Sequence, residues 1–411
     1  MKCLQVLQVE ELKMPAIKNI KNALQGKTGL RWRSWYKVAV GLSFSVAARL
    51  LVWLGRSNAA IALLNWAIAR DKHNLRLNLQ LALVLIHHEQ AQAAITQLQQ
   101  TLTHCGAQAD LLYWLGEAYT RTGNQAAALY NLERAKRLNP ADARVWRAKA
   151  NAAQEQGNTV EALSCYDRAI AADPKDVIAR NAKGLMLLQT NRIEDALICF
   201  EGSLKLRPHD GAVLANKGIC LGKLGRHQEA VSALLGARKC GYATSVLFNN
   251  LAVALSNIGN YADAVENYEQ ALLLAPEDKE ILANLAAALG RSGRFVEALS
   301  YFDQVLEEHG QDALLLNNIA QCLEQLQQPE RALTCYRQAL LLDPVNRVTI
   351  HNLAGCLVTQ CQLEEARDLL DKHLSQDEQD YAAWNLLGVI YDQMRQYDLA
   401  VDCYNLALRL A

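Results

Sequence analysis

Small apolar residues recur along the chain with a fixed period of 34 residues. Alanine stands at eleven equally spaced places, with no insertion or deletion between them: Ala60, Ala94, Ala128, Ala162, Ala196, Ala230, Ala264, Ala298, Ala332, Ala366 and Ala400. If positions within a repeat are numbered from residue 41, these alanines occupy position 20, and position 8 always holds Ala or Gly. A strict period of this length is typical of a repeat array and argues against a single globular core.

Larger apolar residues within each repeat follow helical spacing. Leu251, Leu255 and Ile258 form one stripe, and Val265 and Tyr268 form a second. The small residues at positions 8 and 20 predict a close crossing of two antiparallel helices, because a packed interior leaves no room for an additional methylene. Position 32 predicts the turn to the next repeat, because it often holds proline: Pro140, Pro174, Pro208, Pro276 and Pro344.

One repeat shows a family pattern with little deviation. Gly116, Tyr119, Ala128, Ala135 and Pro140 resemble the signature residues of the tetratricopeptide repeat (TPR) family. The resemblance covers residues 41–411 and implies an all-α, right-handed superhelical solenoid of about eleven helix-turn-helix repeats. We expect altered turn geometry where residues depart from the pattern, namely Thr101, Val305 and His373 at position 27 and Gly106, Tyr242, Gly310 and Glu378 at position 32.

Position 6 carries a row of amides in five consecutive repeats. The row consists of Asn216, Asn250, Asn284, Asn318 and Asn352. It resembles the asparagine ladder in the TPR superhelix of O-linked N-acetylglucosamine transferase, which implies that it faces a concave groove and grips a peptide backbone. Each amide offers two donors and an acceptor. The alternative is that each amide bonds to neighbouring backbone of its own array.

Other residues of the first helix complete the predicted peptide-binding site. The polar members are Asn249 and Asn317 at position 5 and Lys223, Asn257 and Arg291 at position 13. Apolar or small residues at positions 9 and 12 would form the floor between them. A second TPR mode, the carboxylate clamp for chaperone C-termini, has its first half in Arg147 and Asn151, but Ala182 lacks the amide that the second half requires.

Charge argues against nucleic acid as the partner, because Lys+Arg and Asp+Glu balance at 42 each. Residues 1–40 form a separate basic segment, in which Ile17, Ile20 and Leu24 fit a capping helix. Residues 31–54, which are basic and aromatic and then apolar, fit a peripheral membrane contact as the alternative. The repeat register continues through this run and favours a first repeat instead.

Cysteine and histidine placement predicts no metal site and no cofactor. Repeat-equivalent cysteines behave as small buried hydrophobes, and the odd total of eleven fits a reducing, cytoplasmic location. Cys356 and Cys361 lack partners at metal-ligand spacing, and no His-x-x-x-His pair occurs. Gly26-Lys27-Thr28 lacks the earlier glycine of a phosphate-binding loop.

The sequence therefore predicts a non-catalytic scaffold or adaptor that binds an extended peptide segment of a partner protein. Two alternatives remain: a membrane-associated assembly factor that uses residues 31–54, and the substrate-binding subunit of a glycosyltransferase-type enzyme. Because no polar helix covers the last repeat, we also expect that repeat to pair with a second copy or to fray.

Overall fold

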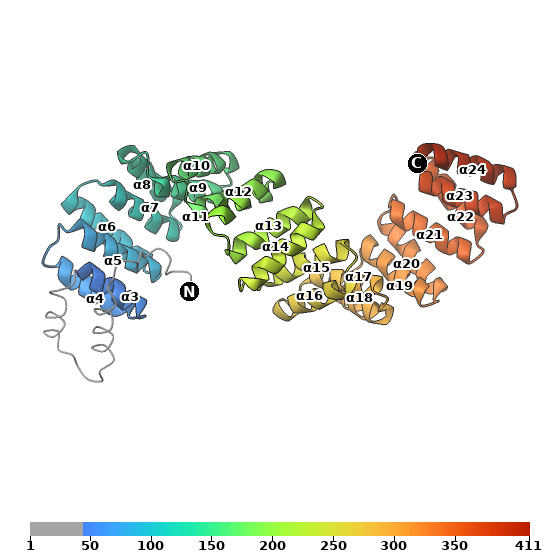
Figure 1. Cartoon of the computed structure of the whole chain (residues 1–411), viewed down its shortest axis with the longest axis horizontal. Helices are drawn as coiled ribbons and strands as arrows, with labels where there is room; N and C mark the ends of the chain where they lie inside the picture. The colour runs from blue at the N-terminus through green and yellow to red at the C-terminus, as the bar shows by residue number, and fades with distance from the viewer. Residues whose placement is uncertain (1–43) are drawn as a thin grey trace, which may run out of the picture. The chain divides into compact units, whose positions relative to one another are not determined.

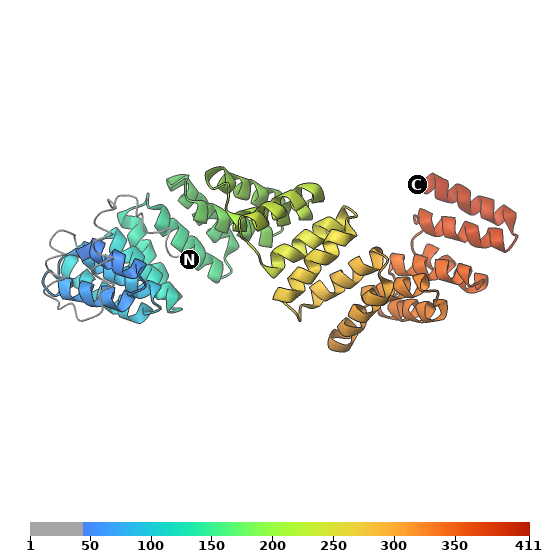
Figure 2. The ribbon, with the colours of Figure 1, turned by 60° about the horizontal axis from the view of Figure 1, so that its bottom comes forward.

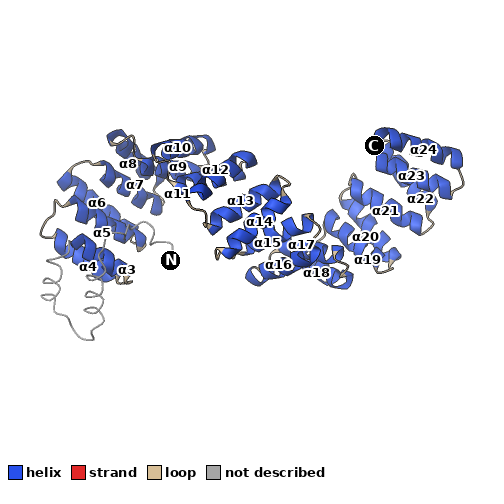
Figure 3. Ribbon diagram, viewed as in Figure 1, coloured by secondary structure: helices blue, strands red, loops and turns tan. Residues whose placement is uncertain are grey.

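The computed structural model describes residues 44–411. This part of the chain contains 22 α-helices and no strand (Figures 1 and 3). The prediction of an all-α helical repeat solenoid is therefore confirmed. None of these helices is both long enough and apolar enough to cross a bilayer.

The chain divides into two compact units, and the boundary between them in the sequence falls between Thr190 and Asn191. The helices of the first unit are α3 Phe44–Trp53, α4 Ser57–Ile68, α5 Leu75–His87, α6 Ala91–Cys105, α7 Ala109–Arg121, α8 Gln125–Leu138, α9 Ala143–Glu155, α10 Thr159–Ala172 and α11 Val177–Gln189.

The second unit begins with α12 and ends with α24, and successive helices within it lie side by side (Figure 2). Its helices are α12 Ile193–Leu206, α13 Gly211–Lys223, α14 His227–Lys239, α15 Ser245–Asn257, α16 Tyr261–Leu274, α17 Lys279–Arg291, α18 Phe295–His309, α19 Ala313–Gln325, α20 Pro329–Leu342, α21 Arg347–Thr359, α22 Leu363–Leu374, α23 Tyr381–Gln393 and α24 Tyr397–Leu410.

Small residues allow the two helices of a repeat to cross closely, as predicted. A Cβ atom on Gly218 of α13 would lie 2.5 Å from Cγ of Leu234 in α14, which is closer than real Cβ atoms approach. Gly116 meets Leu132 in the same way, and Gly388 meets Tyr404. The position-20 alanines are buried in all eleven repeats. Position 8 therefore stays small because the large residue at position 24 of the same repeat packs against it.

The turn inside each repeat uses a left-handed residue at position 15. Six repeats place glycine there, and five place another residue with φ between 58° and 61°: Glu89, Asn191, Gln327, Cys361 and Arg395. L-residues other than glycine adopt this conformation at a cost, because Cβ crowds the following carbonyl oxygen. The turn geometry is thus kept even where the favoured residue is absent.

Position 34 caps the first helix of the next repeat. A side-chain oxygen accepts a hydrogen bond from the first turn of that helix at Asn74, Asp142, Asp176, Asp210, Thr244, Asp278, Asp312, Asn346 and Asp380. These caps satisfy backbone N–H groups that have no partner within the helix. The sequence analysis did not identify this series.

The turns that depart from the proline pattern do have altered geometry. Helices α6 and α18 each reach 15 residues and end at Gly106 and Gly310, which have φ of 73° and 80°. Helix α22 has only 12 residues and precedes the turn that contains Glu378. Glycine thus lets two of these helices run one residue further before the chain reverses.

The first described helix belongs to the array. Helix α3 buries Ala47, Ala48 and Leu51 against its own repeat and the next one. The expected capping helix near Ile17 and the predicted membrane contact of residues 31–43 lie outside the described residues. The apolar residues at 44–53 are used for packing in the first repeat, and half of the Trp53 side chain remains exposed.

Candidate functional site

The asparagine ladder lies entirely in the second unit. Its members come from five first helices, namely Asn216 in α13, Asn250 in α15, Asn284 in α17, Asn318 in α19 and Asn352 in α21. All five are partly exposed, although leucines and alanines next to them in sequence are buried. Position 6 therefore turns its side chain away from the core in each repeat.

Three ladder members line one pocket of about 690 Å³. Asn284, Asn318 and Asn352 contribute to its wall from three consecutive repeats, and Arg291 lies at its margin. Of the other predicted site residues, Lys223, Asn216, Asn249, Asn250, Asn257 and Asn317 are not among the residues that line this pocket. The structure thus gathers four of the ten predicted residues into one cavity.

The walls of this pocket are mixed in character. Phe295 and Leu314 supply apolar surface, and the Leu314 side chain is 68% exposed. Ala287 and Gly290, at positions 9 and 12, also line the pocket. Such a pocket combines apolar surface with a few convergent polar groups, which is the usual composition of a binding site.

Charge within the pocket is also mixed. Arg291 supplies the positive group, whereas Asp312 and Glu324 are acidic. The Tyr336 hydroxyl donates a hydrogen bond of 2.6 Å to Oε2 of Glu324, and Oδ1 of Asp312 caps α19 by accepting from the Leu315 N–H. The two carboxylates are therefore engaged by the protein, whereas Arg291 is exposed.

The amides of the ladder differ in their hydrogen bonds. Nδ2 of Asn250 donates to the Val246 carbonyl at 2.7 Å, one helical turn earlier. Nδ2 of Asn352 donates to Oδ1 of Asn317 in the preceding repeat at 3.0 Å. Asn257, at position 13, donates to the Val253 carbonyl at 2.9 Å. The alternative of bonding to the protein's own groups therefore applies to these three residues.

The remaining amides of the ladder have no such partner. Asn216, Asn284 and Asn318 form no side-chain hydrogen bond with any described residue. Oδ1 of Asn249, in the repeat before Asn284, is buried and lacks a partner among the described residues.

Sequence reasoning missed three exposed apolar residues beside the ladder. Val246, Leu314 and Val348 occupy position 2 of their repeats, one turn before an asparagine, and are 57%, 68% and 59% exposed. The repeat between Val246 and Leu314 has the exposed Glu280 at this position, so the apolar surface is interrupted there. Of the three, Leu314 lines the pocket.

The residues of the half-formed chaperone clamp have partners within the protein. Nη1 of Arg147 forms an ion pair with Asp176, and Oδ1 of Asn151 accepts a hydrogen bond of 2.7 Å from the Tyr166 hydroxyl. Both side chains thus stabilise the first unit.

The cysteines behave as the sequence predicts. All ten that the structure describes are free thiols, and six of them are buried. Burial raises the pKa of the Cys220, Cys322 and Cys403 thiols to about 11. A protonated buried thiol is a poor nucleophile, which agrees with a packing role.

Solved structures with a similar fold include several repeat proteins. One is titled YrrB, a TPR protein with an unusual peptide-binding site; it is 22% identical, the match covers 45% of this chain and 96% of that chain, and the TM-score is 0.42. A TPR protein from Parabacteroides merdae is 17% identical, with 61% and 98% covered and a TM-score of 0.44. The APC/C hetero-tetramer Cut9-Hcn1 is 14% identical, with 92% and 89% covered and a TM-score of 0.47. At such values these structures do not indicate a function.

No curated protein matches this sequence. Family models give a definite result. Three models, each described as tetratricopeptide repeat, match residues 46–110, 109–142, 147–210, 187–243, 249–313, 313–346 and 381–411. Because these matches extend over well more than half of the sequence, the chain belongs to the tetratricopeptide repeat family, whose repeats form protein-interaction scaffolds.

Proposed function

We propose that the second unit binds an extended segment of a partner protein along the row that includes Asn284, Asn318 and Asn352. The single observation that carries this proposal is the pocket that these three amides share. Equivalent side chains from consecutive repeats present the same donors and acceptor at a regular spacing, and an extended backbone offers complementary groups at regular intervals.

The free amides define how the segment would be held. Asn284 and Asn318 can each donate to a peptide carbonyl and accept from a peptide N–H without breaking a hydrogen bond of the protein. Asn352 is oriented by its bond to Asn317 and can still accept through its own oxygen. These contacts are to backbone, so they place few demands on the sequence of the partner.

The apolar wall would supply selectivity. Phe295 and Leu314 line the pocket beside the amides and favour an apolar side chain of the partner. Arg291 at the margin favours an acidic group near it. We therefore expect a preferred segment that is extended, carries an apolar anchor and has a neighbouring carboxylate.

The test uses a library of displayed random peptides selected on the full chain, followed by measurement of Kd for one selected peptide. The double substitution Asn284→Ala with Asn318→Ala should weaken binding by about 1–3 kcal/mol, because each lost hydrogen bond contributes roughly 0.5–1.5 kcal/mol. Helicity, measured by circular dichroism, should be unchanged.

Thr334→Ala is the control. Its hydroxyl is exposed, bonds to the Glu330 carbonyl of its own helix and does not line the pocket, so the Kd of this variant should equal that of the wild type. If the double variant binds the peptide as tightly as the wild type does, the ladder is not the binding site and the proposal fails.

A further inference from the structure

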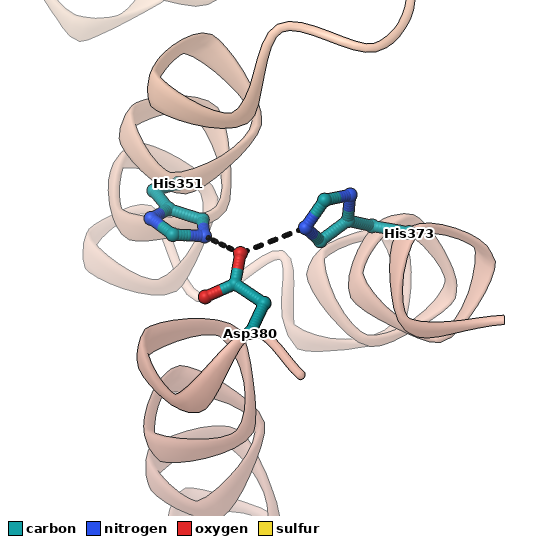
Figure 4. A group of neighbouring side chains, drawn as sticks. All are labelled: His351, His373 and Asp380. Carbon is teal, nitrogen blue, oxygen red and sulfur yellow. Dashed lines mark hydrogen bonds and ion pairs between the residues drawn. The ribbon is translucent and has the colours of Figure 1, made fainter. Parts of the chain in front are cut away.

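Two imidazoles and a carboxylate converge in the second unit, and none of the three residues lines the pocket (Figure 4). Nε2 of His351 lies 2.7 Å from Oδ2 of Asp380, and Nε2 of His373 lies 2.8 Å from the same oxygen. The three potential ligand atoms all lie within 4.8 Å of one another. This is the one group of three such residues found within residues 44–411.

Three elements of the fold bring these side chains together. His351 lies in α21 at position 5 of the repeat, His373 lies in α22 at position 27 of the same repeat, and Asp380 caps the start of α23. The Asp380 side chain is fully buried, and that of His373 is 7% exposed. His351 is 20% exposed and leaves the group accessible from one side.

The other oxygen of Asp380 is held by the protein. Oδ1 accepts hydrogen bonds from Nη2 of Arg347 at 2.6 Å and from the backbone N–H groups of Ala382 and Ala383 at 3.1 Å each. These three donors hold Oδ1 in place and leave Oδ2 to the two histidines. The side chain is therefore an oriented carboxylate whose Oδ2 faces the two imidazoles.

We propose that His351, His373 and Asp380 bind a divalent transition-metal ion, with Zn²⁺ as the best match. Imidazole nitrogen and carboxylate oxygen are common zinc ligands, at about 2.0–2.2 Å from the metal. Tetrahedral geometry at those lengths separates two ligand atoms by roughly 3.3 Å, so each Nε2–Oδ2 distance would lengthen by about 0.5 Å. Each imidazole would coordinate through Nε2 and carry its proton on Nδ1.

The surroundings suit a carboxylate that binds through one oxygen. The donors to Oδ1 are outer contacts that fix its orientation, as carboxylate ligands of metals usually require. Water would provide the fourth ligand on the exposed side, next to His351. Arg347 adds an opposing positive charge, and Asp377, whose backbone N–H donates to the His373 carbonyl, adds a negative charge in the same turn.

A repeat in the first unit shows what capping alone requires. Asp176 occupies the same repeat position as Asp380 and is paired with Arg147 at position 5. One guanidinium therefore suffices to pair with the capping carboxylate in that repeat, where position 27 holds Ala169. In the tenth repeat, Arg347 already pairs with Asp380 in this way. The two imidazoles are additional, and both can act as metal ligands.

The test measures Zn²⁺ binding to the full chain by isothermal titration calorimetry after dialysis against a chelator. His373→Ala restores the residue most frequent at position 27, and His351→Asn restores the residue that four other repeats have at position 5. Both variants should remain folded. Each should lose one equivalent of Zn²⁺ or bind it at least about tenfold more weakly. Zn²⁺ should raise the Tm of the wild type more than that of either variant.

Exposed thiols at Cys240 and Cys361 are the main competing ligands, and Co²⁺ distinguishes them. Cobalt at this site should show the visible bands of a tetrahedral nitrogen and oxygen set, without the thiolate charge-transfer band. His104→Ala is the control, because His104 packs edge to face against His73 with ring centroids 5.8 Å apart and belongs to no group of three possible ligands within residues 44–411. The proposal fails if the wild type binds no Zn²⁺, or if both histidine variants bind it as the wild type does.

Discussion

Asn352 donates a hydrogen bond of 3.0 Å from its side-chain nitrogen to the side-chain oxygen of Asn317, which lies in the preceding repeat. Asn317 is 3% exposed, whereas Asn352 reaches the pocket. The bond therefore connects the packed interior between α19 and α21 with the surface that we propose binds peptide. Asn352 thus contributes a hydrogen bond between repeats to the stability of the fold, whereas Asn284 and Asn318 form no side-chain hydrogen bond with the described residues.

Asn352→Ala should lower the free energy of unfolding by about 1–3 kcal/mol, because the buried Asn317 oxygen would lose its donor. Urea unfolding followed by circular dichroism measures this change. Asn318→Ala serves as the comparison, since its amide has no partner among the described residues, and its effect should stay within about 0.5 kcal/mol. Equal losses in the two variants would contradict the role of the bond.

Two glycines of α13 should respond oppositely to the same substitution. Gly218→Ala places a methyl group 2.5 Å from Leu234 Cγ and should destabilise the second unit by about 1–3 kcal/mol. Gly222→Ala meets nothing within 4 Å and should stabilise the helix by roughly 0.5–1 kcal/mol. Thermal unfolding of both variants checks the prediction, which requires opposite signs of the change in Tm.

The left-handed position between the two helices offers a reciprocal pair of variants. Gln327→Gly removes a strained φ of 58° and should stabilise the array by up to about 1 kcal/mol. Gly259→Ala should destabilise it by a similar amount, although a Cβ at Gly259 has no neighbour within 4 Å. Chemical denaturation measures both. A loss of stability in Gln327→Gly would show that the side chain makes contacts worth more than the strain.

A carboxylate in the first unit should make stability depend on pH. Hydrogen bonds from Lys136 and Lys149 lower the pKa of Glu133 from 4.5 to about 2. A lowered pKa in the folded state stabilises the fold fully above the unfolded value of 4.5, and the contribution disappears as the pH falls towards 2. Glu133→Gln should therefore lower the Tm at neutral pH, and the difference from the wild type should shrink below pH 4.5.

Glu229→Gln is the control for that series, because Glu229 pairs with Arg226 at the surface, where their side chains are 58% and 46% exposed. Such pairs contribute little to stability, so its Tm should follow that of the wild type at every pH. A pH-independent difference for Glu133→Gln would show that its effect does not arise from ionisation.

The sequence could predict the helices and their crossings because each repeat samples the same packing. The small residue at position 8 and the large residue at position 24 recur eleven times, and the clash at Gly218 explains both. The left-handed turn was harder to find, because five repeats lack glycine at position 15. The packing of the two helices on either side of the turn forces these five residues into the left-handed conformation, and their residue types do not reveal it.

The side-chain contacts of the two candidate sites could not be predicted from the repeat pattern of the sequence. The ladder was visible because its members are equivalent, but their hydrogen bonds depend on individual neighbours, as Asn250 and Asn352 demonstrate. The group of His351, His373 and Asp380 uses three non-equivalent positions of the repeat. His373 was recognised only as a departure from the small residue at position 27. Its partners become apparent only when α21, α22 and α23 are packed together.

The bond from Asn352 to Asn317 has a consequence for how such a chain can be rearranged. Every block of 34 residues has the same length and the same pattern of two helices, so a block could be removed or copied without shifting the repeat register of the others. The side chains differ between blocks, because Asn352 bonds to Asn317 in the block before it and Arg337 pairs with Glu365 in the block after it. The blocks have the same shape, but their order is fixed by side-chain contacts between neighbouring blocks.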